Sequence, residues 1–115
     1  MTGPVGPYTP IVRAGDWLVV SGQVGLRDGS LIHGGTREQL GQALDNLRSL
    51  LESQGASMDD VVKTTVFLRH LSDYAAMNET YVAAFGEHRP ARSAIGVAEL
   101  PLNALVEIEA WAWVG

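Results

Sequence analysis

One stretch of the chain repeats its leucines with the spacing of a helix. The leucines recur three or four residues apart: Leu40, Leu44, Leu47 and Leu51. That spacing places them on one side of a helix, where they can pack against a core. Thr36 is a candidate N-cap, Gln39 completes a capping box three residues later, and Gly55 suits the left-handed residue that ends a helix. We therefore predict a helix over residues 36–54.

A second helix is expected later in the chain. Ser72 is its candidate N-cap, and Asp73 lies in the first turn, where a negative charge is favourable. Gly86 marks the end of this helix. The apolar side of the helix consists of Tyr74, Met77, Tyr81 and Phe85.

Strands are predicted in the remaining ordered segments. Residues 11–13 and 17–21 flank a Gly-Asp turn signal and indicate a β-hairpin, and residues 61–69 are rich in Val, Thr and Phe. Further strands are expected over residues 92–97 and 105–114, with a short edge strand at 31–32. This order of elements predicts an α+β or α/β fold in which two helices pack on one face of a mixed sheet. We expect a single domain over residues 1–115.

Two helices leave the second face of such a sheet uncovered. In the last strand the apolar residues Val106, Ile108 and Ala110 alternate with Glu107, Glu109, Trp111 and Trp113. The first set suits the side that packs on the helices, so the second set places two tryptophans on the open face. A contiguous aromatic strip indicates an interface between chains. The alternative is that the tryptophans fold over local edges within a monomer.

The composition narrows the class of protein. With 115 residues, 46% of them hydrophobic and 18% charged, the chain fits one globular domain, and the absence of cysteine excludes disulfides and a thiol nucleophile. A net charge of −5 weighs against nucleic-acid binding, which usually uses a basic face. The longest apolar run, residues 17–20, is too short to span a membrane. Residues 1–4 lack the features of a secretion signal, so we expect a cytoplasmic protein.

Several polar residues lie where they need an explanation. Arg92 opens an otherwise apolar strand, where an unpaired guanidinium is costly. It forms a salt bridge with Glu107 or Glu109, or it binds a small carboxylate through its forked guanidinium. Glu107 is either that ion-pair partner or a base that positions a water molecule. Tyr8 is either a hydrogen-bonding lid or a packed loop residue, and Asn78 lies on the helix surface or reaches a neighbouring chain.

Familiar catalytic motifs do not occur in the chain. The histidines lack the spacing of metal ligands and are expected as solvated residues at turns: His33, His70 and His88. Ser21 precedes Gly22, but there is no Gly-x-Ser-x-Gly elbow, so a serine hydrolase is disfavoured. Gly34-Gly35 indicates a turn rather than a phosphate-binding loop.

A set of motifs runs from residue 6 nearly to the C-terminus. They are Gly6-Pro7-Tyr8, Val20-Ser21-Gly22-Gln23, residues 42–47, residues 60–68, residues 77–81, Pro90-Ala91-Arg92-Ser93, Leu100-Pro101 and residues 106–110. In their order and spacing they resemble the Rid family of reactive intermediate deaminases, also called YjgF-like proteins. The resemblance implies a chorismate-mutase-like α+β fold and a homotrimer, in which three sheets form a central barrel with clefts between neighbouring subunits.

The resemblance also implies an activity. Deaminases of this family hydrolyse short-lived 2-imino or 2-enamino acids to 2-oxo acids and ammonia, without a metal or an organic cofactor. By this resemblance Arg92 would hold the carboxylate of the small-molecule substrate, and Glu107 would orient or activate the attacking water. The other residues of the implied cleft, which line it or contact the bound acid, are Tyr8, Ser21, Gly22, Asn78 and Ala94.

Other functions compete with this hypothesis. The chain could be a non-catalytic trimer that binds small carboxylates as a regulator or pathway accessory, which a direct hydrolysis assay would distinguish. Ribonuclease activity is disfavoured by the net charge of −5, and chorismate mutase activity would rest on the fold alone. Pro10 and Arg89 stand where family members often carry a glutamine and an aromatic residue. Both departures border the implied cleft, so they bear on which substrate it takes.

Overall fold

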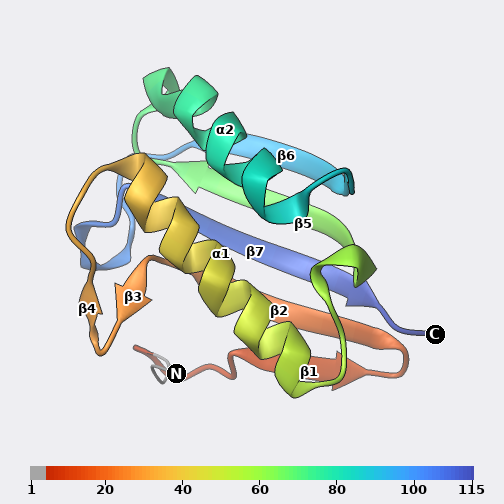
Figure 1. The fold of residues 1–115 in the computed structure, drawn as a ribbon. Helices are drawn as coiled ribbons and strands as arrows, with labels where there is room; N and C mark the ends of the chain where they lie inside the picture. Colours follow the sequence, from red (N-terminus) through yellow and green to blue (C-terminus); the bar gives the residue numbers. More distant parts are fainter. Residues whose placement is uncertain (1–4) are drawn as a thin grey trace.

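A five-stranded mixed sheet carries both long helices on one of its faces (Figure 1). This computed structural model describes residues 5–115. Residues 1–4, which lack the features of a secretion signal, lie outside the described residues. The strands of the sheet are β1 (Ile11–Ala14), β2 (Trp17–Gln23), β5 (Val61–Leu68), β6 (Ala91–Gly96) and β7 (Val106–Trp113). They are ordered β1-β2-β7-β5-β6, and only β5 and β6 run parallel. The α+β architecture predicted from the sequence is confirmed.

The helices form a layer over the middle of the sheet. Helix α1 (Thr36–Ser53) crosses β7 and β2, and α2 (Tyr74–Phe85) lies beside it over β5 and β6 (Figure 1). Short 3₁₀ turns lead into β5, α2 and β7: η1 (Met58–Asp60), η2 (Leu71–Asp73) and η3 (Pro101–Asn103). A separate ribbon of β3 (Leu26–Arg27) and β4 (Ser30–Leu31) contains the predicted edge strand, shifted by one residue.

The core lies between the helices and the sheet. All four leucines of the predicted helix are buried, which confirms that they lie on the side of α1 that faces the core. Gly55 follows the end of α1 with φ +76°, as predicted for a left-handed residue. From β7, Val106, Ile108 and Ala110 face the same core and are fully buried. Burial of a large aliphatic side chain stabilises a fold by about 1.5–3 kcal/mol, so this layer holds the two helices on the sheet.

The start of α1 differs from the prediction. Gly35, not Thr36, is the N-cap, and its backbone N–H donates to Glu38 Oε1 at 2.7 Å. Thr36 is buried, and its hydroxyl donates to Asp73 Oδ2 at 2.6 Å. The side chain of Gln39 accepts a hydrogen bond from Leu105 N at 2.9 Å, so neither polar side chain is available as a cap. Both instead connect α1 to distant segments.

The start of α2 is also different. Ser72 is not the N-cap, because residues 71–73 form η2 and Asp73 precedes the helix while its carboxylate bonds Thr36. Met77, Tyr81 and Phe85 are buried as predicted, but Tyr74 is 45% exposed. The apolar side of α2 therefore continues beyond the part of the helix that packs on the core.

One histidine also departs from its prediction. His33 and His70 are exposed, as expected for solvated turns. His88 is half-buried, and its Nε2 lies 2.7 Å from the carbonyl oxygen of Val61. It therefore ties the segment after α2 to the first residue of β5.

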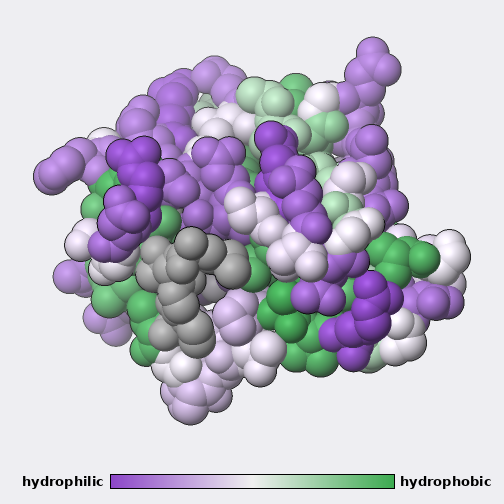
Figure 2. All heavy atoms as spheres, turned by 60° about the horizontal axis from the view of Figure 1, so that its bottom comes forward, coloured by the Kyte–Doolittle hydropathy of each residue, from purple (hydrophilic) through white to green (hydrophobic). Residues whose placement is uncertain are grey.

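The second sheet face carries aromatic side chains. Trp111 and Trp113 are 45% and 44% exposed, and the Trp17 ring meets them edge-on at centroid distances of 6.0 and 5.0 Å. Figure 2 looks at the edge of the sheet on the side of the β1–β2 hairpin, where green hydrophobic patches lie between purple hydrophilic residues. No helix in residues 5–115 covers this face, as the alternation in β7 predicted.

Candidate functional site

Arg92 lies on the edge strand β6 and reaches toward α2. In the sheet it pairs with Thr64 of β5, whose side chain is buried under the helices. The guanidinium carbon lies 4.8 Å from the centroid of the Tyr81 ring and 5.5 Å from that of Tyr74. Arg92 Nη2 donates to the Tyr74 hydroxyl at 3.0 Å. Within residues 5–115 this is the one hydrogen bond of the guanidinium, so most of its N–H groups remain free to bind an anion.

The tyrosine beneath Arg92 is firmly held. Tyr81 is buried, its hydroxyl lies 2.7 Å from Thr64 Oγ1, and its ring packs on Phe85 at a centroid distance of 4.7 Å. Burial raises the pKa of Tyr81, and the hydrogen bond with Thr64 and the charge of Arg92 oppose that rise. Tyr81 therefore stays neutral near pH 7 and presents an aromatic surface to the cation.

Asn78 and Ala94 lie in the same region. Asn78 is on α2, four residues after Tyr74 and three before Tyr81, a spacing that puts all three on one side of the helix. Its Oδ1 is buried and has no hydrogen-bond partner within residues 5–115. Ala94 follows Arg92 by two residues on β6, shares its face of the sheet, and packs against the core. We call Arg92, Tyr74, Asn78 and Tyr81 the arginine cluster.

Glu107 lies on the opposite face of the sheet. Its carboxylate is half-buried against β2, where a Cβ atom at Gly22 would stand only 2.5 Å from Glu107 Oε2. Any side chain at position 22 would displace the carboxylate, so the glycine makes room for it. Burial raises the pKa of Glu107, and the negative charge of Glu109 raises it further.

The N-terminal segment comes close to the same part of β2. Ser21 holds it twice, since its backbone N–H donates to Pro10 O at 2.9 Å and its hydroxyl donates to Thr9 O at 2.6 Å. Tyr8 lies just before this anchor and is 42% exposed. Ser21, Gly22 and Glu107 therefore form a second group, which we call the glutamate cluster.

One chain does not bring the two clusters together. Arg92 is in register with Thr64, and Thr64 with Ala110, on the side of the helices. Glu107 precedes Ala110 by three residues, which places it on the other face and roughly 10 Å further along the strands. Within residues 5–115 the only ion pair joins Arg37 and Glu79, so within one chain Arg92 forms no salt bridge with Glu107 or Glu109.

The structure also bears on metals and membranes. In the described part of the chain, no three histidine, aspartate or glutamate side chains come together where they could hold a metal ion. Neither α1 nor α2 combines the length and the apolar character that a helix needs to cross a membrane.

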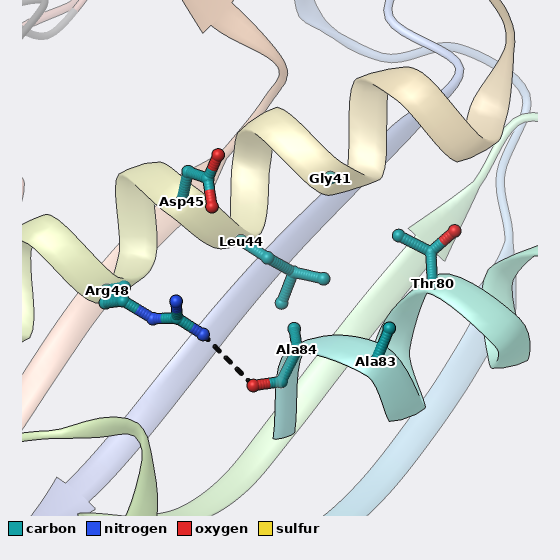
Figure 3. A pocket seen from close by; sticks show the side chains of 7 residues that line it. All are labelled: Gly41, Leu44, Asp45, Arg48, Thr80, Ala83 and Ala84. Carbon is teal, nitrogen blue, oxygen red and sulfur yellow. Dashed lines mark hydrogen bonds between the residues drawn. The ribbon is translucent and has the colours of Figure 1, made fainter. Parts of the chain in front are cut away.

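A shallow groove runs between α1 and α2 on the outer surface, with a volume of about 300 Å³ (Figure 3). Small residues line it, among them Gly41, Ala83 and Ala84, together with Asp45 and Arg48. Arg48 Nη2 donates to the carbonyl oxygen of Ala84 at 3.1 Å, near the C-terminus of α2, as the dashed line shows (Figure 3). A cation at this position stabilises the helix end, so Arg48 has a structural role.

Tyr74 is the member of the arginine cluster that the sequence analysis did not single out. Its spacing with Met77 and Tyr81 assigned it to the buried side of α2. Its position at the start of a helix, four residues before the polar Asn78, was the feature of the sequence that could have indicated a partly exposed tyrosine.

Fold and site together define a class of protein. The chain is a small α+β protein whose mixed sheet has helices on one face, an arginine cluster at its edge and a half-buried carboxylate on its open face.

The comparisons with known proteins give the family. The model of the family described as "Endoribonuclease L-PSP" matches residues 2–114. A RutC family protein of Pyrococcus horikoshii is 42% identical over 112 residues, which are 96% of this chain and 89% of the relative. The 2-iminobutanoate/2-iminopropanoate deaminase of Escherichia coli (strain K12) is 40% identical over 112 residues, 94% of this chain and 88% of the relative. The chain belongs to the Rid (YjgF-like) family, as its motifs implied.

Solved structures agree with the fold. RidA from the Antarctic bacterium Psychrobacter sp. superposes with a TM-score of 0.94 at 38% identity, covering 97% of this chain and 92% of that one. E. coli TdcF, solved with bound serine, gives a TM-score of 0.93 at 35% identity, and the match covers 98% of this chain and 92% of TdcF. At these identities the likeness reaches beyond the fold to the family.

Proposed function

We propose that this protein is a deaminase that hydrolyses reactive 2-imino or 2-enamino acids to 2-oxo acids and ammonia. Relatives at about 40% identity carry the name 2-iminobutanoate/2-iminopropanoate deaminase, including the proteins of E. coli and Mus musculus. The observation that carries the proposal is the state of Glu107: a half-buried carboxylate, opposite Gly22, with no cation beside it in the described residues.

Glu107 suits the role of base in this reaction. A carboxylate whose pKa is raised by burial accepts a proton more readily than an exposed one. In the proposed step, water adds to the carbon of the protonated imine while Glu107 takes one of its protons, which gives a neutral carbinolamine. The carboxyl group then passes that proton to the amine nitrogen. The C–N bond breaks as the carboxylate takes the proton of the hydroxyl group, and ammonia leaves with the 2-oxo acid. Water and substrate supply every atom of the products.

Arg92 suits the role of carboxylate clamp. Its guanidinium is forked and positively charged, and it has free N–H groups. Bidentate binding of the substrate carboxylate would place the neighbouring imine carbon at a fixed position. Fixing the reacting atoms in this way is a large part of what an enzyme contributes to an easy reaction.

The two roles require more than one chain. Arg92 and Glu107 lie on opposite faces of the sheet, so a cleft that holds both needs Arg92 from one subunit and Glu107 from its neighbour. The exposed tryptophans of the open face favour such an assembly. We propose a homotrimer with clefts between subunits, lined also by Tyr8, Ser21, Gly22, Asn78 and Ala94.

An assay of imine hydrolysis tests the proposal. An amino-acid oxidase generates imines in situ from several amino acids, and the imine that survives is trapped and counted with and without the protein. We expect hydrolysis faster than in water alone for at least one small imine, and loss of that rate in Arg92→Ala. No acceleration for any imine, with binding of 2-oxo acids retained, would instead favour a non-catalytic carboxylate-binding trimer.

The family description adds one control. Because it contains the word endoribonuclease, the same preparation should be incubated with single-stranded RNA. We expect no cleavage, because the chain has a net charge of −5 and lacks the basic face that nucleic-acid binding usually uses.

A further inference from the structure

Tyr74 has no role in the hydrolysis proposed above, yet it makes the one hydrogen bond to the Arg92 guanidinium within residues 5–115. It is the first residue of α2, 45% exposed, and its hydroxyl accepts a bond of 3.0 Å from Arg92 Nη2. We propose that Tyr74 is a positioning residue, which holds the guanidinium in the orientation that binds the substrate carboxylate. This inference rests on the proposed function, in which Arg92 is the clamp.

The two tyrosines constrain the guanidinium in different ways. Tyr81 lies beneath it, at 4.8 Å from ring centroid to guanidinium carbon, and is itself held by Thr64. Stacking on a ring fixes the height of the cation but leaves it free to turn above the ring face. The hydrogen bond to Tyr74 is directional, so it stops that rotation.

A clamp on β6 needs this constraint. Arginine has a long side chain with several rotatable bonds, and β6 is an edge strand with no neighbour on its outer side. An unrestrained guanidinium would lose rotational freedom each time it bound a carboxylate, and that loss weakens binding. Bidentate binding also needs two N–H groups aligned with two oxygens. Tyr74 meets both requirements before the substrate arrives.

A hydroxyl group is well suited to this task. It is neutral, so it holds the guanidinium without cancelling its charge, whereas a glutamate in the same place would compete with the substrate. Tyr74 engages one N–H group, and the others remain available. Removal of the hydroxyl should therefore weaken carboxylate binding and leave the attack of water almost unchanged.

Tyr74→Phe tests the role of the hydroxyl, because it keeps the ring. For this variant and the wild type we would measure kcat, KM, the Kd of 2-oxobutanoate, and the rotation of the Arg92 guanidinium by ¹⁵N NMR. Loss of one hydrogen bond to a charged group should raise KM and Kd roughly 5- to 10-fold. The rotation should become faster, and kcat should stay within about two-fold, since substrate affinity alone is affected.

Two further variants make the test specific. Tyr74→Leu also removes the ring and should raise KM and Kd by a further factor of roughly three or more. Val82→Ala is the control, because Val82 is an exposed residue of α2 outside the arginine cluster and should match the wild type in every measurement. Melting temperatures and NMR spectra establish that each variant is folded.

The outcomes separate this inference from the proposed function. If Tyr74→Phe leaves KM, Kd and guanidinium rotation unchanged, or lowers kcat alone, the positioning role is wrong. If the wild type hydrolyses no imine, but the Tyr74 variants still free the guanidinium and weaken acid binding, the proposed function fails and the positioning role stands. A wild type that neither hydrolyses imines nor binds a 2-oxo acid overturns both.

Discussion

Glu107 is a carboxylate without a positive partner within residues 5–115. Burial makes its charged form costly, and Glu109 on the same face adds repulsion, so both effects raise the pKa of Glu107. A group with no structural partner gains nothing for the fold from its charge. Its position opposite Gly22, where any side chain would displace the carboxylate, fits the proposed role of a base.

Substitution of Glu107 tests that explanation. Glu107→Gln keeps the shape and removes the base, so we expect turnover to fall roughly 100-fold while a 2-oxo acid still binds through Arg92. Glu109→Gln is the matched control, with the same change on the same face two residues later, and should retain most of the turnover. Steady-state kinetics and product titration measure both. If Glu107→Gln turns over normally and Glu109→Gln shows a strong loss, then Glu109 is the base and the assignment to Glu107 is wrong.

The raised pKa of Glu107 also predicts a pH dependence of stability. In the folded protein this pKa lies above the unfolded value of about 4.5, so the unfolded state binds fewer protons between the two values. The stability associated with Glu107 is fully present below pH 4.5 and is lost as the pH rises through the folded pKa. Denaturation with urea should show that Glu107→Gln stabilises more at pH 7 than at pH 4, at equal protein concentration. An equal effect at both pH values would contradict the raised pKa.

At the scale of elements, Asn46 connects α1 to the segment around β3. Its Nδ2 donates to the carbonyl oxygens of Val24 and Leu26 at 3.2 and 3.0 Å. Asn46→Ala leaves both partly buried carbonyls unpaired, so we expect the free energy of unfolding to fall by about 1–3 kcal/mol. Asp45→Ala, at the exposed neighbouring position, should change it by less than about 0.5 kcal/mol. Urea denaturation of both variants measures the difference, and equal losses would show that the two hydrogen bonds do not matter.

The elements that depend on local pattern could be predicted from the sequence. The leucines of α1 repeat on one side of a helix, and the residues of β7 alternate between the core and the open face. Each pattern lies within one segment of the chain, so it predicts that segment's secondary structure without knowledge of the rest. The caps were less predictable. Thr36 and Ser72 have the chemistry of N-caps, but the Thr36 hydroxyl instead bonds Asp73, a contact between residues far apart in the chain.

The arrangement of the site could not be predicted from local pattern. Alternation in β7 places Glu107 on the open face, but the face of Arg92 and its distance from Glu107 depend on the register of three strands, set by pairs such as Thr64 with Arg92. Tyr74 shows the same limit. Helical spacing placed it on the buried side of α2, yet at the sheet edge Arg92 is its partner and no core covers it.

For the whole molecule, the open face predicts the assembly. Trp111 and Trp113 should be buried between chains, so the wild type should have a mass near three times the 12.3 kDa of one chain. The double variant Trp111→Ala/Trp113→Ala should dissociate at micromolar concentration, because it removes two large exposed aromatic side chains from that face. Val82→Ala, which removes an exposed side chain from α2, should not. Light scattering measures each mass, and a wild-type monomer would disprove the trimer.

The placement of Arg92 and Glu107 on opposite faces has a genetic consequence. Two alleles, one encoding Arg92→Ala and one Glu107→Gln, should each be inactive alone and should complement each other. When their products are unfolded together and refolded as mixed trimers, about a quarter of the clefts combine an intact arginine with an intact glutamate from neighbouring subunits. Activity should return to about that fraction of the wild-type rate. If both residues served one cleft from the same chain, every mixed cleft would lack one of them, and the two alleles would never rescue each other.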